Sequence, residues 1–265
     1  MYPKDILPGI DLYTICLGVA FVAAILVFRM FSDRYKLKGR FHNFCIYTAM
    51  FSIPFGYFSA ILFQAFYNIK KYGGLVLDSK TGATFYGGLI GGALSFILIY
   101  FCVGRIWYKD SFEHLKNFFT VANIASAAIA LAHGIGRIGC LMAGCCYGKE
   151  TDAWFGIYLD SAGAKVIPTQ LFEAIVLFCL FAFFVFRLIK NKKYNLSLYM
   201  SVYGAWRFAV EYIRDDYRGS TVVDFLTPSQ LVALLMILGA VGIFVFEYKV
   251  NKKAVAADEK AYDIE

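Results

Sequence analysis

Seven blocks of predominantly apolar residues, each about 20 residues long, follow one another along the 265-residue chain. A helix of that length crosses the hydrocarbon core of a bilayer, which is about 30 Å thick. Hydrophobic residues make up 60% of the chain and aromatic residues 18%, a composition outside the usual range of soluble domains. The sequence therefore predicts an all-α, polytopic integral membrane protein with seven transmembrane helices. The blocks occupy residues 12–31, 43–66, 87–107, 118–141, 169–189, 196–213 and 229–246.

Basic residues predict the orientation of these helices. The connections after the first, third and fifth blocks are rich in Lys and Arg, whereas the connections after the second, fourth and sixth mix them with Asp and Glu. Cytoplasmic connections retain Lys and Arg, so we expect the N-terminus outside and the C-terminus in the cytoplasm. The net charge of +7 follows from this asymmetry and gives no support to nucleic-acid binding. We expect one membrane domain, residues 1–246, and a short charged cytoplasmic tail, residues 247–265.

Ionisable side chains interrupt the sixth block. Tyr203, Arg207, Glu211 and Arg214 follow one another at helical spacing, so they form one polar stripe. The stripe must face protein or a water-filled cavity, because charges that face lipid at this depth are expensive. We therefore expect a functional site here. The alternative is that Arg207 and Glu211 form an ion pair that only joins two helices.

A second polar feature is the glycine-rich end of the fourth block, where Arg137 lies among the glycines of residues 133–139. Glycines weaken a helix and make backbone N–H groups accessible to a ligand. A guanidinium offers a fixed fork of donors that matches phosphate oxygens. The segment therefore predicts a phosphate site. His133 lines this site or is a hydrogen-bonded structural histidine, whereas we expect His42 and His114, which stand among Lys and Arg, at the solvent or the membrane interface.

Three of the seven cysteines, Cys140, Cys145 and Cys146, lie within seven residues beside the glycine-rich segment. Their thiols suit nucleophilic, redox or metal chemistry. The spacing matches no standard zinc pattern, and adjacent cysteines rarely bind one metal together, so we expect no metal site. A disulfide or another redox role is an alternative to close packing of a glycine-rich helix end. The other four cysteines are isolated in apolar blocks, where free cysteine acts as a small apolar residue.

Four separated stretches carry a further signal. They are Tyr-Gly-Gly-Leu-Ile-Gly-Gly at 86–92, His-Gly-Ile-Gly-Arg-Ile-Gly at 133–139, Pro-Thr-Gln-Leu-Phe-Glu at 168–173 and Tyr-Gly-Ala-Trp-Arg-Phe-Ala-Val-Glu-Tyr-Ile-Arg at 203–214, with Gln230 after them. In order and spacing they resemble the prolipoprotein diacylglyceryl transferase family. By itself, the first stretch also favours close packing of helices.

The chain departs from the pattern of this family at two places. Tyr86 replaces the usual histidine, and Gly-Cys-x-x-Ala-Gly-Cys-Cys-Tyr-Gly at 139–148 replaces the usual Asn and Glu signature block. These changes remove an imidazole and a carboxylate from the region where the family carries out its proton chemistry.

The resemblance implies transfer of the diacylglyceryl group of phosphatidylglycerol to the thiol of a lipobox cysteine in a prolipoprotein, which forms a thioether and releases glycerol phosphate. It implies no cofactor and no nucleic-acid partner. The implied partners are phosphatidylglycerol, the prolipoprotein signal peptide and the membrane lipids of a bacterial plasma membrane. In such a reaction the thiol must lose its proton, and the charge of the leaving phosphate must be stabilised.

The resemblance also assigns roles to residues of this chain. Arg137 and Arg207 would stabilise the phosphate, and Glu211 would hold Arg207 or accept a proton. Tyr86 stands where a base is expected, but a phenol with a pKa of about 10 is a poor base. The positive field of the arginines is an alternative means of deprotonating the acceptor thiol. The residues expected to bind substrate are Tyr203, Gly139, Cys140, Gly87, Gly88, His133 and Gln170.

Two other functions fit the same residues. A member of this family that acts on a different acceptor would not cause unmodified lipoprotein precursor to accumulate when it is absent. A non-catalytic lipid-binding or transport protein with a structural Arg–Glu pair would move lipid across liposomes without any covalent change.

Overall fold

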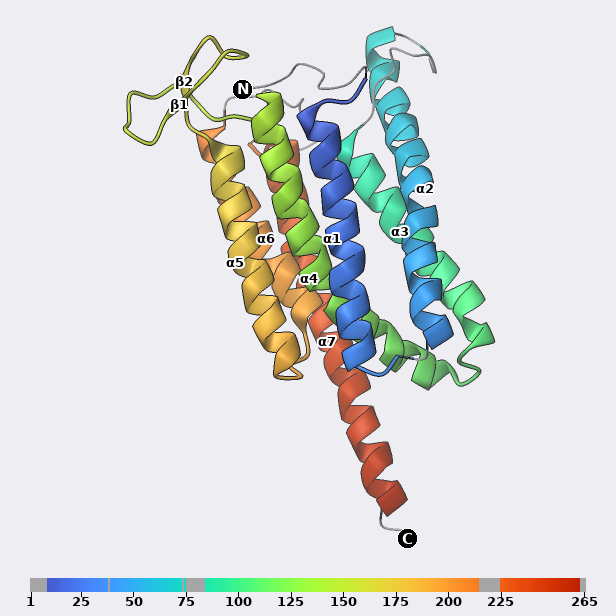
Figure 1. Cartoon of the computed structure of the whole chain (residues 1–265). Helices are drawn as coiled ribbons and strands as arrows, with labels where there is room; N and C mark the ends of the chain where they lie inside the picture. Colours follow the sequence, from blue (N-terminus) through green and yellow to red (C-terminus); the bar gives the residue numbers. More distant parts are fainter. Residues whose placement is uncertain (1–8, 38, 73, 75–83, 215–224, 263–265) are drawn as a thin grey trace. The chain divides into compact units, whose positions relative to one another are not determined.

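The computed structural model describes the chain except for residues 1–8, 38, 73, 75–83, 215–224 and 263–265. The described residues form α-helices and one small β-hairpin, which confirms the predicted all-α membrane protein (Figure 1). The elements are α1 (Leu12–Arg34), α2 (Gly39–Tyr72), α3 (Phe85–Val103), α4 (Ser111–Ala143), β1 (Ile157–Leu159), β2 (Ala164–Val166), α5 (Thr169–Ile189), α6 (Asn195–Val210) and α7 (Pro228–Tyr262). Short 3-10 turns follow α3 and α6, at Gly104–Ile106 and Glu211–Ile213.

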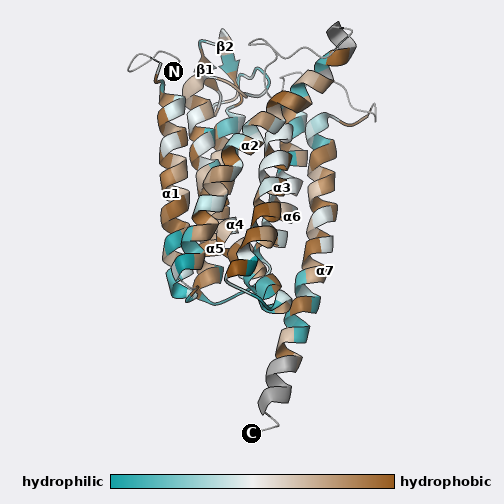
Figure 2. Ribbon diagram, turned by 90° about the vertical axis from the view of Figure 1, so that its right-hand side faces the viewer, coloured by the Kyte–Doolittle hydropathy of each residue, from teal (hydrophilic) through white to brown (hydrophobic). Residues whose placement is uncertain are grey.

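Six of the described helices, α1 to α5 and α7, are long and apolar enough to cross a membrane. Figure 2 shows apolar residues along their length and hydrophilic residues near their ends. The sixth expected span, residues 196–213, forms only the 16-residue α6 and the 3-10 turn after it. An α-helix of that length is about 24 Å long, which is less than the hydrocarbon core. Seven spans and their orientation therefore stay predictions.

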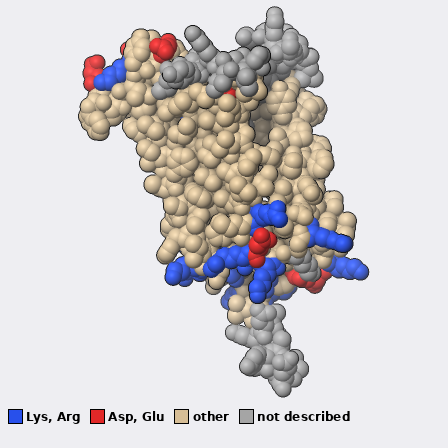
Figure 3. All heavy atoms as spheres, in the orientation of Figure 1, with Lys and Arg blue, Asp and Glu red and all other residues tan. Residues whose placement is uncertain are grey.

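The chain divides into two compact units, Met1–Phe31 with Phe118–Glu265 and Ser32–Asn117. In the first unit, α1, α4, α5, α6 and α7 run along roughly one direction (Figure 1). Helix α7 continues to Tyr262, so the expected charged tail is helical as far as the structure describes it. On the face in Figure 3, Lys and Arg side chains gather at the helix ends that the α5–α6 connection joins. That connection and the end of α5 carry Arg187, Lys190, Lys192 and Lys193.

Backbone pairing folds the connection between α4 and α5. Strands β1 and β2 are antiparallel, with Ile157 opposite Val166, Tyr158 opposite Lys165 and Leu159 opposite Ala164. The segment before them also pairs: the Gly148 N–H donates to the Ile167 carbonyl at 2.8 Å, and the Lys149 N–H donates to the Ile213 carbonyl at 2.9 Å. A Cβ at Gly148 would lie 2.6 Å from the Ile213 oxygen, so only glycine fits there. The connection is thereby attached to the 3-10 turn after α6.

In the second unit, α2 and α3 pack closely through small residues. A Cβ at Gly87 would lie 2.7 Å from the Cβ of Phe63, and a Cβ at Gly56 would lie 2.8 Å from the carbonyl oxygen of Gly88. Small residues of this kind let two helix backbones approach each other in a membrane. These contacts support the packing interpretation of the glycine cluster at 85–92.

The same unit corrects the expectation for two histidines. His42 and His114 are both buried. The His114 ring stacks on the Tyr100 ring with centroids 4.7 Å apart, and the Tyr100 hydroxyl donates to the His114 carbonyl at 3.3 Å. The expectation of a solvated or interfacial position was wrong for His114 because the first turn of α4 packs against α3, a contact that the neighbouring basic residues do not reveal.

Candidate active site

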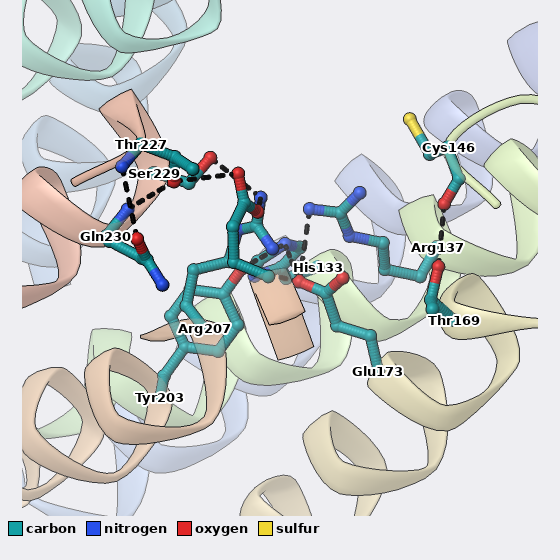
Figure 4. Close-up of polar contacts among 11 residues, drawn as sticks. His133, Arg137, Cys146, Thr169, Glu173, Tyr203, Arg207, Thr227, Ser229 and Gln230 are labelled. Carbon is teal, nitrogen blue, oxygen red and sulfur yellow. Dashed lines mark hydrogen bonds and ion pairs between the residues drawn. The ribbon is translucent and has the colours of Figure 1, made fainter. Parts of the chain in front are cut away.

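A buried carboxylate joins three helices of the first unit. Glu173 on α5 has a fully buried side chain, and its Oε1 lies 3.1 Å from Nη2 of Arg137 on α4. The hydroxyl of Tyr203 on α6 donates to the same oxygen at 2.6 Å. Figure 4 shows the three side chains directed toward one another. Because a buried charge needs a partner and hydrogen bonds, these contacts hold Arg137 in one position.

His133 lies between two tyrosines that are one helical turn apart on α6. Its Nδ1 is 3.2 Å from the Tyr199 hydroxyl and its Nε2 is 3.4 Å from the Tyr203 hydroxyl. The two phenol rings stack with centroids 5.7 Å apart. Since the Tyr203 hydroxyl donates its hydrogen to Glu173, its oxygen accepts from Nε2–H of His133. This network supports a structural role for His133 within the site.

The predicted pair of Arg207 and Glu211 forms. Nη2 of Arg207 donates to Oε2 of Glu211 at 2.7 Å and to Oγ of Ser229 at 2.9 Å. The other carboxylate oxygen accepts from the Thr227 hydroxyl at 3.0 Å. The side chains of Thr227 and Gln230 accept from each other's backbone N–H groups at 3.2 and 3.1 Å, a capping box that begins α7. The start of α7 is therefore attached to the ion pair.

The polar stripe faces protein, as its spacing predicts. Tyr203, Arg207 and Arg214 have exposed fractions of only 7%, 5% and 6%. The α-helix itself does not run through the whole stripe, because α6 ends at Val210 and the 3-10 turn begins at Glu211.

The two site arginines have unused hydrogen-bond donors. Nε of Arg137 and Nη1 of Arg207 are buried, and no residue in the described part of the chain accepts from either. Both guanidinium groups are directed into the same region in Figure 4, and both lie close enough to Glu173 to interact with it electrostatically. Buried donors normally have acceptors. The arrangement, which we call the arginine site, therefore suits an anion that supplies several oxygens.

The residues after α4 fold back over its last turn. Cys146 has a left-handed backbone with φ of 64°, and the Cys145 N–H donates to the Cys140 carbonyl at 3.1 Å. The start of α5 holds this loop, because Gln170 Nε2 donates to the Cys145 carbonyl at 2.6 Å and Thr169 Oγ1 donates to the Cys146 carbonyl at 2.8 Å. The Sγ atoms of the three cysteines lie within 4.8 Å of one another. We call them the cysteine cluster.

One thiol of the cysteine cluster is set apart by its surroundings. Hydrogen bonds from Cys140 and Cys145 hold the pKa of the Cys146 thiol well below its usual range, and the Arg214 guanidinium adds to this effect. Hydrogen bonds with Cys140 and Cys146 raise the pKa of the Cys145 thiol well above its usual range. Among these thiols, the surroundings of Cys146 favour the thiolate, which is the form that reacts and binds metals.

Two other expected site residues make structural contacts. A Cβ at Gly139 would lie 3.0 Å from the Cβ of Cys16, so this glycine lets α1 approach α4. Gln170 donates to the loop after α4, and its Oε1 is buried without a partner among the described residues.

Tyr86, Gly87 and Gly88 belong to the second unit, and the side chain of Tyr86 lies outside the described residues. Their roles in a site stay predictions.

The structure adds Glu173 and Tyr199, which sequence reasoning did not place in the site. Glu173 is a carboxylate within the fifth apolar block. A charge at that depth costs free energy, and this cost is the sequence signal that could have identified Glu173 as a site residue. Tyr199 stands four residues before Tyr203 on the same helix face. Nothing in the sequence distinguishes it among the 19 tyrosines of the chain.

Comparisons with known proteins extend over nearly the whole chain. The model of the prolipoprotein diacylglyceryl transferase family matches residues 6–246. Phosphatidylglycerol–prolipoprotein diacylglyceryl transferase 2 of Clostridium perfringens is 32% identical over 248 residues, which cover 91% of this chain and 90% of the relative. The corresponding enzyme of Clostridium tetani is 31% identical over 244 residues, covering 88% of this chain and 91% of the relative. With similarity of this extent, the chain belongs to the prolipoprotein diacylglyceryl transferase family.

Proposed function

We propose that this protein transfers the diacylglyceryl group of phosphatidylglycerol to the thiol of a lipobox cysteine in a prolipoprotein, in the plasma membrane of a bacterium. The products are a thioether-linked lipoprotein precursor and glycerol phosphate. The names of the relatives support both the donor and the acceptor. The apolar helices are consistent with a donor that is itself a membrane lipid.

The observation that carries this proposal is a pair of arginines inside an apolar helix bundle, each with a buried donor that has no acceptor in the described part of the chain. A phosphate group needs N–H donors and positive charge, and a guanidinium supplies both in a bidentate geometry. Glu173 holds Arg137 and Glu211 holds Arg207. Because both guanidinium groups are already fixed, little reorganisation is needed when a phosphate binds.

The reaction makes a specific demand on these arginines. The acceptor sulfur attacks the glyceryl carbon that is bonded to a phosphate oxygen. The S–C bond forms as the C–O bond breaks, and the electron pair of the broken bond stays on the oxygen of glycerol phosphate. Guanidinium groups beside that oxygen stabilise the charge that develops there, and this stabilisation is larger in the transition state than in the bound ester.

Tyr203 and His133 affect the lipid indirectly, through Glu173 and the arginine that it holds. The Tyr203 hydroxyl is engaged with Glu173, and the imidazole is engaged with two phenols. We therefore assign Tyr203 and His133 to the positioning of Arg137. The proton of the acceptor thiol leaves before attack; Tyr86 stays the predicted base, with the field of the arginines as the alternative.

Mass spectrometry of a lipobox peptide tests the proposal. Purified protein is incubated with phosphatidylglycerol and the peptide, and we expect the peptide to gain the mass of a diacylglyceryl group. A matched peptide with serine in place of the lipobox cysteine should gain nothing. If the folded protein modifies neither peptide, or modifies only a thiol outside a lipobox, the proposal is wrong.

A further inference from the structure

The cysteine cluster is a group of reactive side chains that the arginine site does not use. Its three Sγ atoms lie within 4.8 Å of one another. In the described structure, Cys140, Cys145 and Cys146 form no disulfide, and Cys145 is exposed. Close packing explains the cluster poorly, because an exposed thiol gains little from acting as a small apolar residue.

The spacing of the sulfur atoms fits a thiophilic metal ion. Zinc–sulfur bonds are about 2.3 Å long, which places the sulfur ligands of a tetrahedral site about 3.8 Å apart. The upper limit of 4.8 Å in the cluster is within reach of small side-chain rotations. The chain spacing conceals this arrangement, because the left-handed backbone at Cys146 and the hydrogen bond from Cys145 to Cys140 turn the chain back on itself.

The surroundings hold these ligands in place. Thr169 and Gln170 bind the carbonyl groups of Cys146 and Cys145, and Gly148 pairs with the backbone at Ile167. Contacts of this kind orient the ligands of a metal site and contribute to its affinity.

Charge at the cluster is also compatible with a metal–thiolate site. Three thiolates around a divalent ion carry a net charge of about −1. The guanidinium of Arg214 interacts with Cys146, and its side chain is buried, so it offsets this charge. Arg137 stands about one turn before Cys140 on α4 and interacts with it electrostatically. The cluster therefore borders the arginine site.

We propose that Cys140, Cys145 and Cys146 bind one zinc ion and that the acceptor thiol is its fourth ligand. The role of the acceptor thiol rests on the proposed function, whereas the binding of zinc does not. Three protein ligands with one open position are the arrangement of catalytic zinc sites, and sulfur ligands favour zinc over magnesium or calcium.

The acceptor thiol loses its proton when it binds the ion, because a coordinating thiol is deprotonated. The proton passes to water, and a sulfur–zinc bond replaces the S–H bond. The same sulfur then forms the S–C bond as the C–O bond breaks, and the electron pair of the C–O bond stays on the phosphate oxygen. The sulfur–zinc bond breaks when the thioether product leaves, and no oxidation state changes. This route deprotonates the acceptor without relying on the phenol of Tyr86.

Metal analysis of the full-length protein tests the binding. After exposure to zinc sulfate and removal of excess, wild-type protein should retain about one zinc ion per chain, measured by inductively coupled plasma mass spectrometry. The triple variant Cys140→Ser, Cys145→Ser, Cys146→Ser should retain almost none, and the control Cys179→Ser, at an isolated exposed cysteine on α5, should match wild type. Zinc-free wild-type protein, a triple variant that retains zinc, or a disulfide among the three cysteines would overturn the zinc site.

Cobalt in place of zinc tests the fourth ligand independently of catalysis. Adding the lipobox peptide to the cobalt protein should strengthen the sulfur-to-cobalt charge-transfer absorption, and the matched serine peptide should leave it unchanged. An unchanged spectrum with the cysteine peptide would overturn coordination of the acceptor.

Transfer rates separate this inference from the proposed function. At pH 7 the folded triple variant should be slower by up to about 30-fold, because a free thiol with a pKa of about 8.5 is only about 3% ionised. Undiminished transfer by the folded triple variant would overturn the role of the ion and leave the transferase function standing. Zinc binding and the peptide-dependent cobalt spectrum, without transfer by wild-type protein, would overturn the transferase function and leave the zinc site standing.

Discussion

Arg137 on α4 and Glu173 on α5 form an ion pair with a nitrogen–oxygen distance of 3.1 Å, and the carboxylate is fully buried. Such a pair adds little net stability, because the desolvation of both charges offsets much of their attraction. The position of this ion pair indicates a role other than stabilisation of the fold. The pair fixes a guanidinium whose Nε has no acceptor among the described residues, and so it keeps a donor ready for an anion.

Lysine substitutions separate charge from geometry in the arginine site. Arg137→Lys and Arg207→Lys keep the positive charge but lose the planar fork of donors. We expect each to lower the transfer rate by about tenfold or more, the effect of losing roughly 1.4 kcal/mol of charge-assisted hydrogen bonding. Arg29→Lys, at an exposed arginine of α1, is the control and should transfer normally. Normal rates in both site variants would show that charge alone is sufficient.

Glu173→Gln removes the charge that holds Arg137. Breaking one side of a buried ion pair costs about 3–5 kcal/mol in the free energy of unfolding, so we expect a lower melting temperature and a large loss of transfer. Glu247→Gln is a matched control, since this buried carboxylate accepts from Asn123 at 2.8 Å and from the Tyr194 N–H at 3.2 Å. It should lose stability but keep its transfer rate per folded molecule. Equal transfer rates per folded molecule in the two variants would show that Glu173 has no role in the site.

Tyr203→Phe removes the hydroxyl that donates to Glu173. The loss of one net hydrogen bond is worth about 0.5–1.5 kcal/mol, so transfer should fall by up to about tenfold. Tyr199→Phe loses only a contact with His133 and should fall less. The measurement compares the transfer rates of the two purified variants. A loss of rate in Tyr199→Phe that equals or exceeds the loss in Tyr203→Phe would contradict the positioning role of Tyr203.

Glu211→Gln leaves Arg207 without its charged partner at membrane depth. We expect reduced transfer and reduced yield, because an unpaired buried charge is destabilising. Thr227→Val removes the hydroxyl that donates to Glu211 and caps α7, which should cost about 1 kcal/mol and give an intermediate transfer rate. A Glu211→Gln protein with both normal yield and normal activity would show that the pair does not matter.

Length and hydropathy were sufficient to predict most of the fold, because they decide which segments can enter a bilayer. The exceptions have physical causes. Helix α6 is shorter than the predicted block because the chain leaves the α-helical conformation at Glu211. Helix α4 begins at Ser111, before the predicted block, and His114 in its first turn is buried by contacts that hydropathy does not register.

The candidate site, like the fold, was predictable from the sequence only in part. Helical spacing predicts the pair of Arg207 and Glu211, because residues four apart lie on one face. It does not predict that Arg137 meets Glu173, since they come from different helices and their contact depends on how α4 packs against α5. The cysteine cluster depends on a left-handed residue, Cys146, which no periodic pattern reveals.

The central claim is that Arg137 and Arg207 hold the phosphate of phosphatidylglycerol during transfer. The most direct test measures thioether-linked peptide and glycerol phosphate in the same reaction. Wild-type protein should form the two products in equal amounts, and Arg137→Ala and Arg207→Ala, checked for folding, should form neither. Undiminished formation of both products by the two alanine variants would contradict the account.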